Sequence, residues 1–225
     1  MTTRPRLMVL GHARHGKDTF CEKLETKYGY KFVSSSMFMA EKVIFPWFKE
    51  HEGQHQFPHT DGSRSGGAVW PTYETVTDCF LDRANWRAKW FELINQTNTP
   101  DRATLTRMIF ESGNDVYAGL RNQRELHQAR LCKAVDLVIW IDRSQHVPPE
   151  PASSCTVTPQ MADLIIDNNH DLSWLDKQVD ILYNNWLSPM EKPFEIPAGY
   201  VVDPVDEEKL RNAKPGEIIR ILPHA

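Results

Sequence analysis

The sequence predicts an α/β fold in which a five-stranded parallel sheet is covered by helices on both faces. Short apolar runs have the length of buried strands, and segments with helical spacing of apolar residues separate them. The first run ends in a glycine-rich loop that opens onto a helical segment. Strands that alternate with helices form parallel sheets, which bind ligands at the carboxyl ends of their strands. We therefore expect the functional residues to follow strands directly.

The bulk composition limits the partners that we expect. The 225 residues carry a mixed charge distribution with a net charge of -4, which offers no basic surface to a polynucleotide and favours a small phosphorylated ligand. No apolar run approaches the ~18 residues of a membrane span, and the N-terminus does not resemble a signal peptide. The four cysteines form no C-x-x-C pair. We expect a soluble cytoplasmic protein with reduced thiols, no membrane contact and one core with an insert or lid.

The first strand and helix have the clearest pattern. Leu7–Leu10 is a continuous apolar run of the kind that parallel strands show, and Asp18–Tyr28 has helical spacing. Tyr30–Ser34 predicts a second strand. Ser36 is expected to cap a helix that continues to Phe48.

The middle of the chain predicts an insert followed by helices. Residues 51–71 are polar and rich in Gly, Ser and His, which indicates a mobile surface insert. Helical spacing returns over the aromatic-rich stretch 72–96 and again over 102–112.

The last part of the chain completes the predicted sheet. The remaining strands are expected over 115–120, 136–141 and 162–166, and helices over 123–131 and 172–186. The Pro-rich tail from Ser188 carries no recognisable chemistry, and it is expected to form a small peripheral hairpin or to hold a partner.

The loop after the first strand fits the phosphate-binding pattern G-x-x-x-x-G-K. It consists of Gly11, His12, Ala13, Arg14, His15, Gly16, Lys17, Asp18 and Thr19. Its glycines let the backbone wrap a phosphate, its N–H groups and the helix N-terminus attract the anion, and Lys17 neutralises the β- and γ-phosphates. The alternative is a chance glycine turn, but a strand before and a helix after are the context that the motif requires. The loop therefore predicts binding of ATP or GTP.

Asp18 stands where this pattern usually has Ser or Thr. Like charges ~4 Å apart oppose each other by about 4 kcal/mol at an effective dielectric of ~20, so a carboxylate beside a polyphosphate needs a cation between them. We expect Mg²⁺ as the cofactor and Asp18 as its ligand. A solvent-facing Asp that favours the helix dipole is the alternative. A zinc site is not expected, because His12, His15 and the histidines over 51–59 lack supporting Cys or Asp ligands.

Further motifs follow in chain order. They are Gly16-Lys17-Asp18-Thr19, Asp82-Arg83 with Arg87 and Trp90, Gly119-Leu120-Arg121-Asn122 with Arg124-Glu125, Ile141-Asp142-Arg143-Ser144, and Asp163 to Asn168 before Leu172 and Leu175. On these motifs the chain resembles, over 7–186, the bacteriophage-type deoxynucleoside monophosphate kinases. This branch of the P-loop kinases also includes dephospho-CoA kinase-like and phosphomevalonate kinase-like proteins.

The resemblance implies a P-loop kinase fold and a division of the chain. Residues 1–188 would form the kinase domain, with an acceptor-binding helical segment at about 37–112 and a short lid at about 143–155, and 189–225 would be a C-terminal extension. The implied partners are ATP and a nucleoside monophosphate, in the host-cell cytoplasm if the chain is phage-encoded. A homodimer remains open.

The stretch from Tyr117 to Arg121 resembles the strand end of nucleoside monophosphate kinases, where an Asp-Gly pair precedes an arginine that holds the acceptor phosphate. This chain keeps the arginine and has Ala118 in place of the aspartate. We infer that Asp18 replaces that carboxylate from the loop. The alternative for Arg121 is an ion pair with Glu125, one helical turn away.

Phosphoryl transfer requires in-line positioning and neutralisation of the transferring group. The predicted catalytic residues are Lys17, Asp18, Arg121 and Arg143. The predicted acceptor-binding residues are Arg83, Trp86, Arg87, Arg121 and Arg124. Arg83 and Arg87 are expected on one face of one helix, and Trp86 beside the nucleobase. The alternatives are a solvated helix face, with Arg83 paired to a nearby aspartate, and a tryptophan stripe in the core.

The predicted lid carries a single arginine, Arg143, which would reach the transferring phosphate when the lid closes. A strand-end ion pair of Arg143 with Asp142 or Glu150 is the alternative. The loop after the last strand places Asn168 near the adenine of ATP by resemblance, although this residue also suits a turn.

These residues predict ATP-dependent phosphorylation of deoxynucleoside monophosphates to diphosphates. One alternative is a P-loop kinase for another small acceptor, such as a phosphorylated alcohol. A nucleotide-dependent switch is a weaker alternative, because the chain has no D-x-x-G or N-K-x-D segment of the GTPase kind.

Overall fold

The structure, a computed structural model, describes residues 4–54, 69–191, 200–202 and 221–223. It contains one five-stranded sheet in which every adjacent pair is parallel. The strands are β1 Leu7–Leu10, β2 Phe32–Ser34, β3 Val116–Ala118, β4 Leu137–Asp142 and β5 Leu164–Asp167. The predicted five-stranded parallel sheet with helices on both faces is confirmed.

The sheet order is β2-β3-β1-β4-β5, which places β1 between β3 and β4. Leu7 is in register with Val116 on one side and with Leu137 on the other. The chain first moves from β1 to one side of the sheet, and it later crosses to β4 on the other side. This change of direction makes the carboxyl end of β1 the topological switch point, where sheets of this kind bind ligands.

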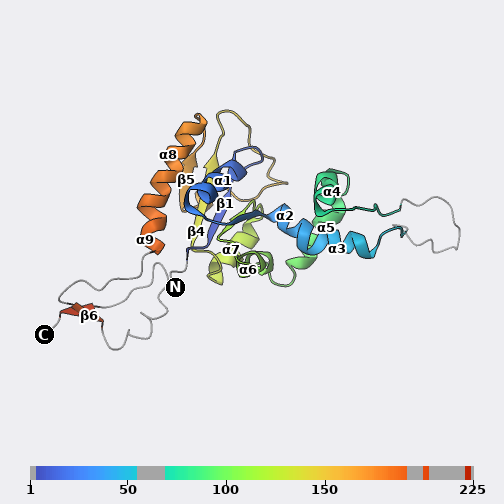
Figure 1. The fold of residues 1–225 in the computed structure, drawn as a ribbon, viewed down its shortest axis with the longest axis horizontal. Coiled ribbons are helices and arrows are strands. Elements are labelled where there is room, and N and C mark those ends of the chain that lie inside the picture. Colours follow the sequence, from blue (N-terminus) through green and yellow to red (C-terminus); the bar gives the residue numbers. More distant parts are fainter. Residues whose placement is uncertain (1–3, 55–68, 192–199, 203–220, 224–225) are drawn as a thin grey trace.

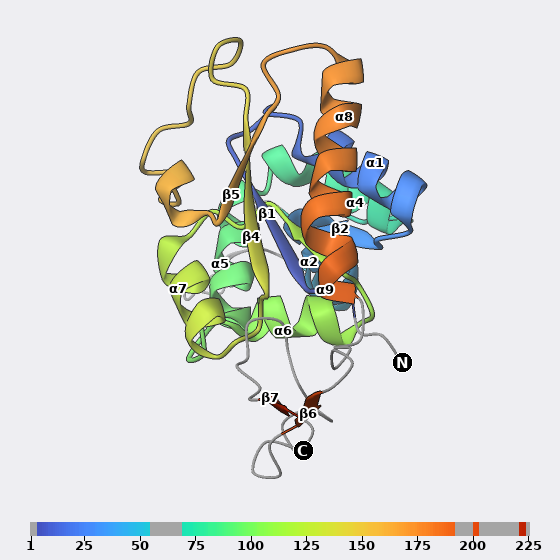
Figure 2. The same ribbon diagram turned by 90° about the vertical axis from the view of Figure 1, so that its left-hand side faces the viewer.

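Alternate side chains of each central strand enter two different cores. Leu7 and Val9 pack with α1 (Lys17–Tyr28) and α8 (Leu172–Leu182), while Met8 and Leu10 pack on the opposite face. Figure 2 shows α1 and α8 together on one side of the sheet. The other face is covered by α6 (Thr104–Glu111) and α7 (Gln123–Leu131). Each central strand is therefore buried on both faces, as its continuous apolar run predicted.

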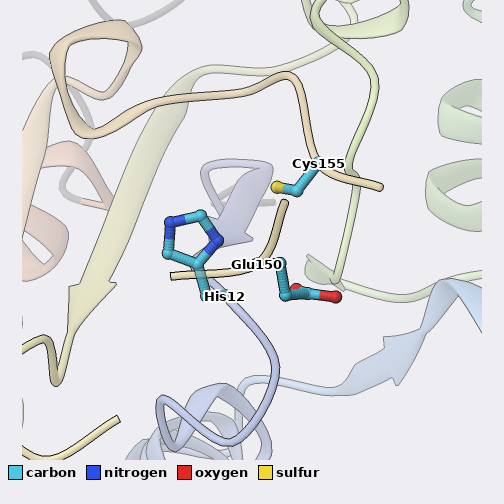
Figure 3. A group of neighbouring side chains, drawn as sticks. All are labelled: His12, Glu150 and Cys155. Carbon is cyan, nitrogen blue, oxygen red and sulfur yellow. The ribbon is translucent and has the colours of Figure 1, made fainter. Parts of the chain in front are cut away.

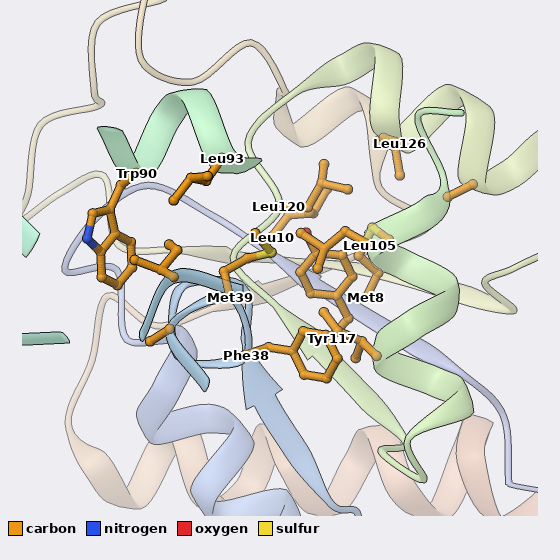
Figure 4. Packing of buried hydrophobic residues seen from close by; sticks show 14 of the residues in the cluster. Met8, Leu10, Phe38, Met39, Trp90, Leu93, Leu105, Tyr117, Leu120 and Leu126 are labelled. Carbon is orange, nitrogen blue, oxygen red and sulfur yellow. The ribbon is translucent and has the colours of Figure 1, made fainter. Parts of the chain in front are cut away.

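The helical segment between β2 and α6 extends away from α8 (Figure 1). It consists of α2 Ser35–Met39, the π-helical turn η1 Ala40–Ile44, α3 Phe45–Glu50, α4 Val76–Leu81, the 3₁₀ turn η2 Asp82–Ala84 and α5 Arg87–Thr97. Trp90 and Leu93 of α5 join the core that contains Met8 and Leu10 (Figure 4). This packing ties the segment to the sheet.

Two local predictions for this segment are wrong. Ser34, and not Ser36, caps α2, because the Ser34 hydroxyl accepts a hydrogen bond from the Met37 amide at 3.2 Å. The stretch 72–96 is not one helix, because it breaks between α4 and α5. At the break, Asp82 accepts hydrogen bonds from the side chains of Asn85 and Trp86, and such local bonds compete with a continuous helix.

The remaining elements lie near the C-terminal part of the chain. They are the 3₁₀ turn η3 Pro159–Met161, the π-helical turn η4 Tyr183–Leu187, α9 Ser188–Glu191, and the antiparallel pair β6 Tyr200–Val202 and β7 Ile221–Pro223. The strand pair agrees with the hairpin expected in the tail. Most of the predicted insert, 55–68, lies outside the described residues. None of the described helices is long and apolar enough to cross a membrane.

Candidate phosphate-binding site

The loop between β1 and α1 has a backbone that two of its glycines make possible. Gly11 has φ 140°, and a Cβ there would lie 2.7 Å from the Ile141 carbonyl oxygen. Gly16 has φ 88°, and a Cβ there would lie 2.3 Å from the side-chain nitrogen of Asn168. Both positions combine a left-handed conformation with a close neighbour. The two glycines of the pattern G-x-x-x-x-G-K are therefore required by the backbone conformation and the packing of this loop.

Asn168 fastens the loop from the end of β5. Its buried amide donates a hydrogen bond of 2.8 Å to the His15 carbonyl oxygen. From the sequence, Asn168 was expected to contact adenine or to form a turn, and neither expectation included this hydrogen bond. It links residues 153 positions apart, which no local pattern reveals.

His15 connects the loop to the start of the predicted lid. Its ring is fully buried, and its Nδ1 accepts a hydrogen bond from the Arg143 amide at 3.1 Å. The ring hydrogen therefore lies on Nε2, which is 3.2 Å from the Val147 carbonyl oxygen and can donate to it. The His15 ring thus positions the chain where it leaves β4.

Lys17 begins α1 and points back over the loop. Its ammonium group donates a hydrogen bond of 2.7 Å to the His12 carbonyl oxygen. Burial lowers the pKa of Lys17, and the positive charge of Arg121 lowers it further. No side chain caps the α1 N-terminus at Gly16. The N-terminal amides of α1 therefore add positive potential beside Lys17.

Asp18 lies in the first turn of α1 with an exposed side chain. Its carboxylate has no hydrogen bond or ion pair within the described residues. An exposed carboxylate beside a phosphate loop has the hard oxygen donors that Mg²⁺ requires. Asp18 therefore fits the predicted metal ligand, and its position equally suits the solvent-facing alternative.

Arg121 reaches the phosphate loop through a glutamate. Its guanidinium group lies 2.5 Å from one carboxylate oxygen of Glu150, and the other oxygen accepts a hydrogen bond from the Ala13 amide at 2.7 Å. The alternative pair of Arg121 with Glu125 does not form, since Glu125 is buried in α7. The structure therefore places Arg121 near Lys17 and links it through Glu150 to the loop.

The other predicted cations lie in different settings. The half-buried Arg143 side chain has no hydrogen bond or ion pair in the part of the chain that the structure describes, so the alternative pairing with Asp142 or Glu150 does not form. Arg124 is exposed in the first turn of α7, which Asn122 caps. Both side chains are available to a ligand.

The predicted helix face of Arg83 and Arg87 is wrong. Arg83 lies in η2 and Arg87 begins α5, so the break between these elements separates them. The Arg83 guanidinium group donates to the Phe80 carbonyl oxygen and lies over the Phe80 ring. Within the described residues neither arginine has a hydrogen bond or ion pair to the phosphate loop.

Trp86 takes part in packing, as the alternative interpretation proposed. Its indole nitrogen donates a hydrogen bond of 2.9 Å to Asp82, and its ring contacts those of Phe48 and Trp70. The Tyr73 hydroxyl donates to the same carboxylate oxygen at 2.7 Å. Asp82 therefore holds an aromatic cluster together, and Trp86 is one of its members.

His12 has neighbours that the sequence did not reveal. One ligand atom each from His12, Glu150 and Cys155 lies within 4.8 Å of the others (Figure 3). The expectation that His12 lacks a supporting cysteine is therefore wrong. Burial lowers the pKa of His12 and raises the pKa of the Cys155 thiol; His15, Lys17 and Arg121 lower the pKa of His12 further, and Glu150 opposes them. The positive charges of Lys17 and Arg121 would repel a metal ion bound by this cluster. We therefore interpret the three side chains as part of the lining of the phosphate site.

The comparisons with known proteins give only distant structural likeness. No family model and no curated protein sequence matches the chain. An unliganded sugar kinase from Janibacter sp. HTCC2649 aligns with a TM-score of 0.41 at 12% identity, covering 85% of this chain and 100% of that one. Shikimate kinase from Bacteroides thetaiotaomicron aligns with a TM-score of 0.39 at 10% identity, covering 81% and 98%. These values are too low to transfer a substrate or a mechanism.

Proposed function

We propose that the chain is a P-loop phosphotransferase that moves the γ-phosphate of ATP to a small acceptor. The observation that carries this proposal is the convergence of three kinds of anion-binding group at the carboxyl end of β1. The Ala13 amide and the Arg121 guanidinium group both contact the Glu150 carboxylate, and Lys17 lies close enough for its charge to interact with Arg121 and with Glu150. Positioning and charge neutralisation are the main requirements of phosphoryl transfer.

Each residue in this proposal has one role. The loop amides from Gly11 to Gly16 hold the β- and γ-phosphates, and Lys17 neutralises charge on both. Arg121 stabilises the transferring group from the β3 side, and Arg143 does so from the lid. Asp18 would hold Mg²⁺, which when bound neutralises charge on the phosphate oxygens.

A deoxynucleoside monophosphate is our first choice of acceptor. The sequence resemblance supports it, and Arg124 offers an exposed cation in the first turn of the helix that follows Arg121. One observation favours the second candidate, a phosphorylated acceptor without a base. Trp86 packs in an aromatic cluster, which removes the best candidate for stacking on a base.

An acceptor panel tests the proposal. Each of the nucleoside and deoxynucleoside monophosphates, and a set of phosphorylated alcohols, is incubated with the protein, ATP and Mg²⁺, and ADP release is measured. Lys17→Ala is the matched control, because its loss removes charge from the transition state and little buried apolar surface. We expect acceptor-dependent ADP release from the wild type, and at least a ~100-fold lower rate from the folded variant. A variant that turns over at the wild-type rate would exclude the kinase proposal.

A further inference from the structure

Glu150 lies on the groups that would bind a phosphate. One carboxylate oxygen accepts the Ala13 amide hydrogen bond, and the other contacts the Arg121 guanidinium group. Two oxygens of one anion thus bridge the phosphate loop and the predicted catalytic arginine. A phosphate group offers oxygens with the same acceptor chemistry at a similar spacing, so it would use the same two donors.

The surrounding chain holds Glu150 in this position. Glu150 lies on the segment that follows β4. At its start, this segment is held by the His15 ring, which is hydrogen-bonded to the Arg143 amide and to the Val147 carbonyl oxygen. It ends where the Thr156 amide donates a hydrogen bond of 2.8 Å to the Arg121 carbonyl oxygen.

Proline residues flank the glutamate on both sides, at Pro148, Pro149 and Pro151. They limit the backbone conformations of Glu150, which reduces the entropy lost when its carboxylate docks. The Glu150 side chain retains 17% of its accessible surface and the Arg121 side chain 43%, so the carboxylate is the more enclosed partner of this contact. Both features favour an ordered contact over a passing surface ion pair.

We propose that Glu150 is an internal ligand that occupies the subsite of the transferring phosphate, and that ATP must displace it. This inference rests on the proposed function, because it assigns the same loop to ATP. A carboxylate and a phosphate carry like charges and cannot share two donors at hydrogen-bond distance. Binding of ATP therefore moves Glu150 outward, while the anchors at His15 and at the Arg121 carbonyl stay in place. The wild type binds ATP more weakly than its loop alone would.

The test measures nucleotide affinity without any acceptor. Dissociation constants of ATP and ADP, each with Mg²⁺, are determined by calorimetry for the wild type, Glu150→Gln and Glu150→Asp. The glutamine loses the charge, and the aspartate keeps the charge but is too short to reach both donors. Asp176→Asn is the control, since it removes a carboxylate whose partners are Lys23 and Lys27 and not the groups that hold Glu150. Thermal unfolding of each protein checks that it is folded.

We expect both Glu150 variants to bind ATP about tenfold more tightly than the wild type, as the loss of one competing charge-assisted contact implies. ADP affinity should rise less, because ADP lacks the phosphate that would replace the carboxylate. Equal or weaker ATP binding by the folded variants would overturn the proposal. Normal ATP binding with no turnover on any acceptor would contradict only the proposed function. Absence of ATP binding in all proteins would contradict both.

Discussion

At the scale of single residues, the phosphate loop separates residues that shape the backbone from residues whose charge acts on a ligand. Gly11 and Gly16 shape it, because each has a positive φ and a close neighbour that leaves no room for a side chain. Lys17 and Asp18 supply charge, and neither belongs to the apolar core. Substitutions of the first kind should change folding, and substitutions of the second kind should change chemistry.

Asp18→Asn tests the proposed metal role. If the Asp18 carboxylate binds Mg²⁺, removing one negative charge should raise the Mg²⁺ concentration for half-maximal rate by about threefold or more, with the rate recovering at high Mg²⁺. The measurement is initial rate against Mg²⁺ at saturating ATP and acceptor. A solvent-facing Asp predicts only a fraction of a kcal/mol in stability. Superimposable normalised curves for the two proteins would rule out the metal role.

At the scale of elements, the sequence predicted buried segments better than exposed ones. All five strands overlap their predicted ranges, and the continuous apolar runs of β1 and β4 identify strands that are covered on both faces. The helical segment after β2 was harder. Ser34, Ser35 and Ser36 are all suited to cap a helix, and the sequence alone does not choose among them. The break at Asp82 depends on hydrogen bonds that helical periodicity does not encode.

Asn168→Ala tests how β5 supports the loop. The substitution leaves the His15 carbonyl oxygen without its partner in a buried setting, so we expect a loss of about 1–3 kcal/mol in the free energy of unfolding. The loop should also become less ordered, which weakens ATP binding by about tenfold. Chemical denaturation and calorimetry measure the two effects.

Asn114→Ala provides the control for this comparison. The Asn114 amide donates to the Ile109 carbonyl oxygen at the end of α6, away from the loop. The Asn114→Ala variant should be less stable than the wild type but should bind ATP with the same affinity. If Asn168→Ala lowers stability and leaves ATP binding unchanged, the loop does not depend on this bond for its function.

At the scale of the whole molecule, the candidate site is only partly local in sequence. The loop from Gly11 to Thr19 was predictable because one motif carries its backbone requirements and its charge. The contact between Ala13 and Glu150 was not, because 137 residues separate its partners and a β-strand crossing brings them together. The place of Arg121 after a strand predicted that its charge would lie near the site, but nothing in the sequence predicted Glu150 as its partner. Sequence patterns thus indicate the chemistry of a site better than its internal contacts.

The buried Glu125 makes stability depend on pH. Burial raises the pKa of Glu125 in the folded protein above its ordinary value of 4.5. The folded state therefore holds this proton more tightly than the unfolded state, so Glu125 adds stability as the pH falls and removes it as the pH rises through the raised pKa. Glu125→Gln cannot ionise, so it should be more stable than the wild type at pH 7.

The advantage of Glu125→Gln should shrink as the pH falls towards 4.5 and stay constant below it. Melting temperatures of both proteins between pH 4 and pH 8 measure this difference, with the exposed Glu111→Gln as a control that should show no such trend. A constant difference across this range would mean that burial of Glu125 does not affect its ionisation.

The contact between Gly16 and Asn168 has a consequence for how this chain tolerates change over evolution. Asn168 binds a main-chain carbonyl of the loop, and Glu150 binds a main-chain amide. Neither contact depends on which side chains occupy the positions between the two glycines. Substitution at Arg14 is therefore limited by its left-handed backbone, whereas a larger residue at Gly16 is opposed both by the positive φ and by the Asn168 amide. Shortening residue 168 removes only one of these two obstacles, so position 16 should remain glycine even where position 168 changes.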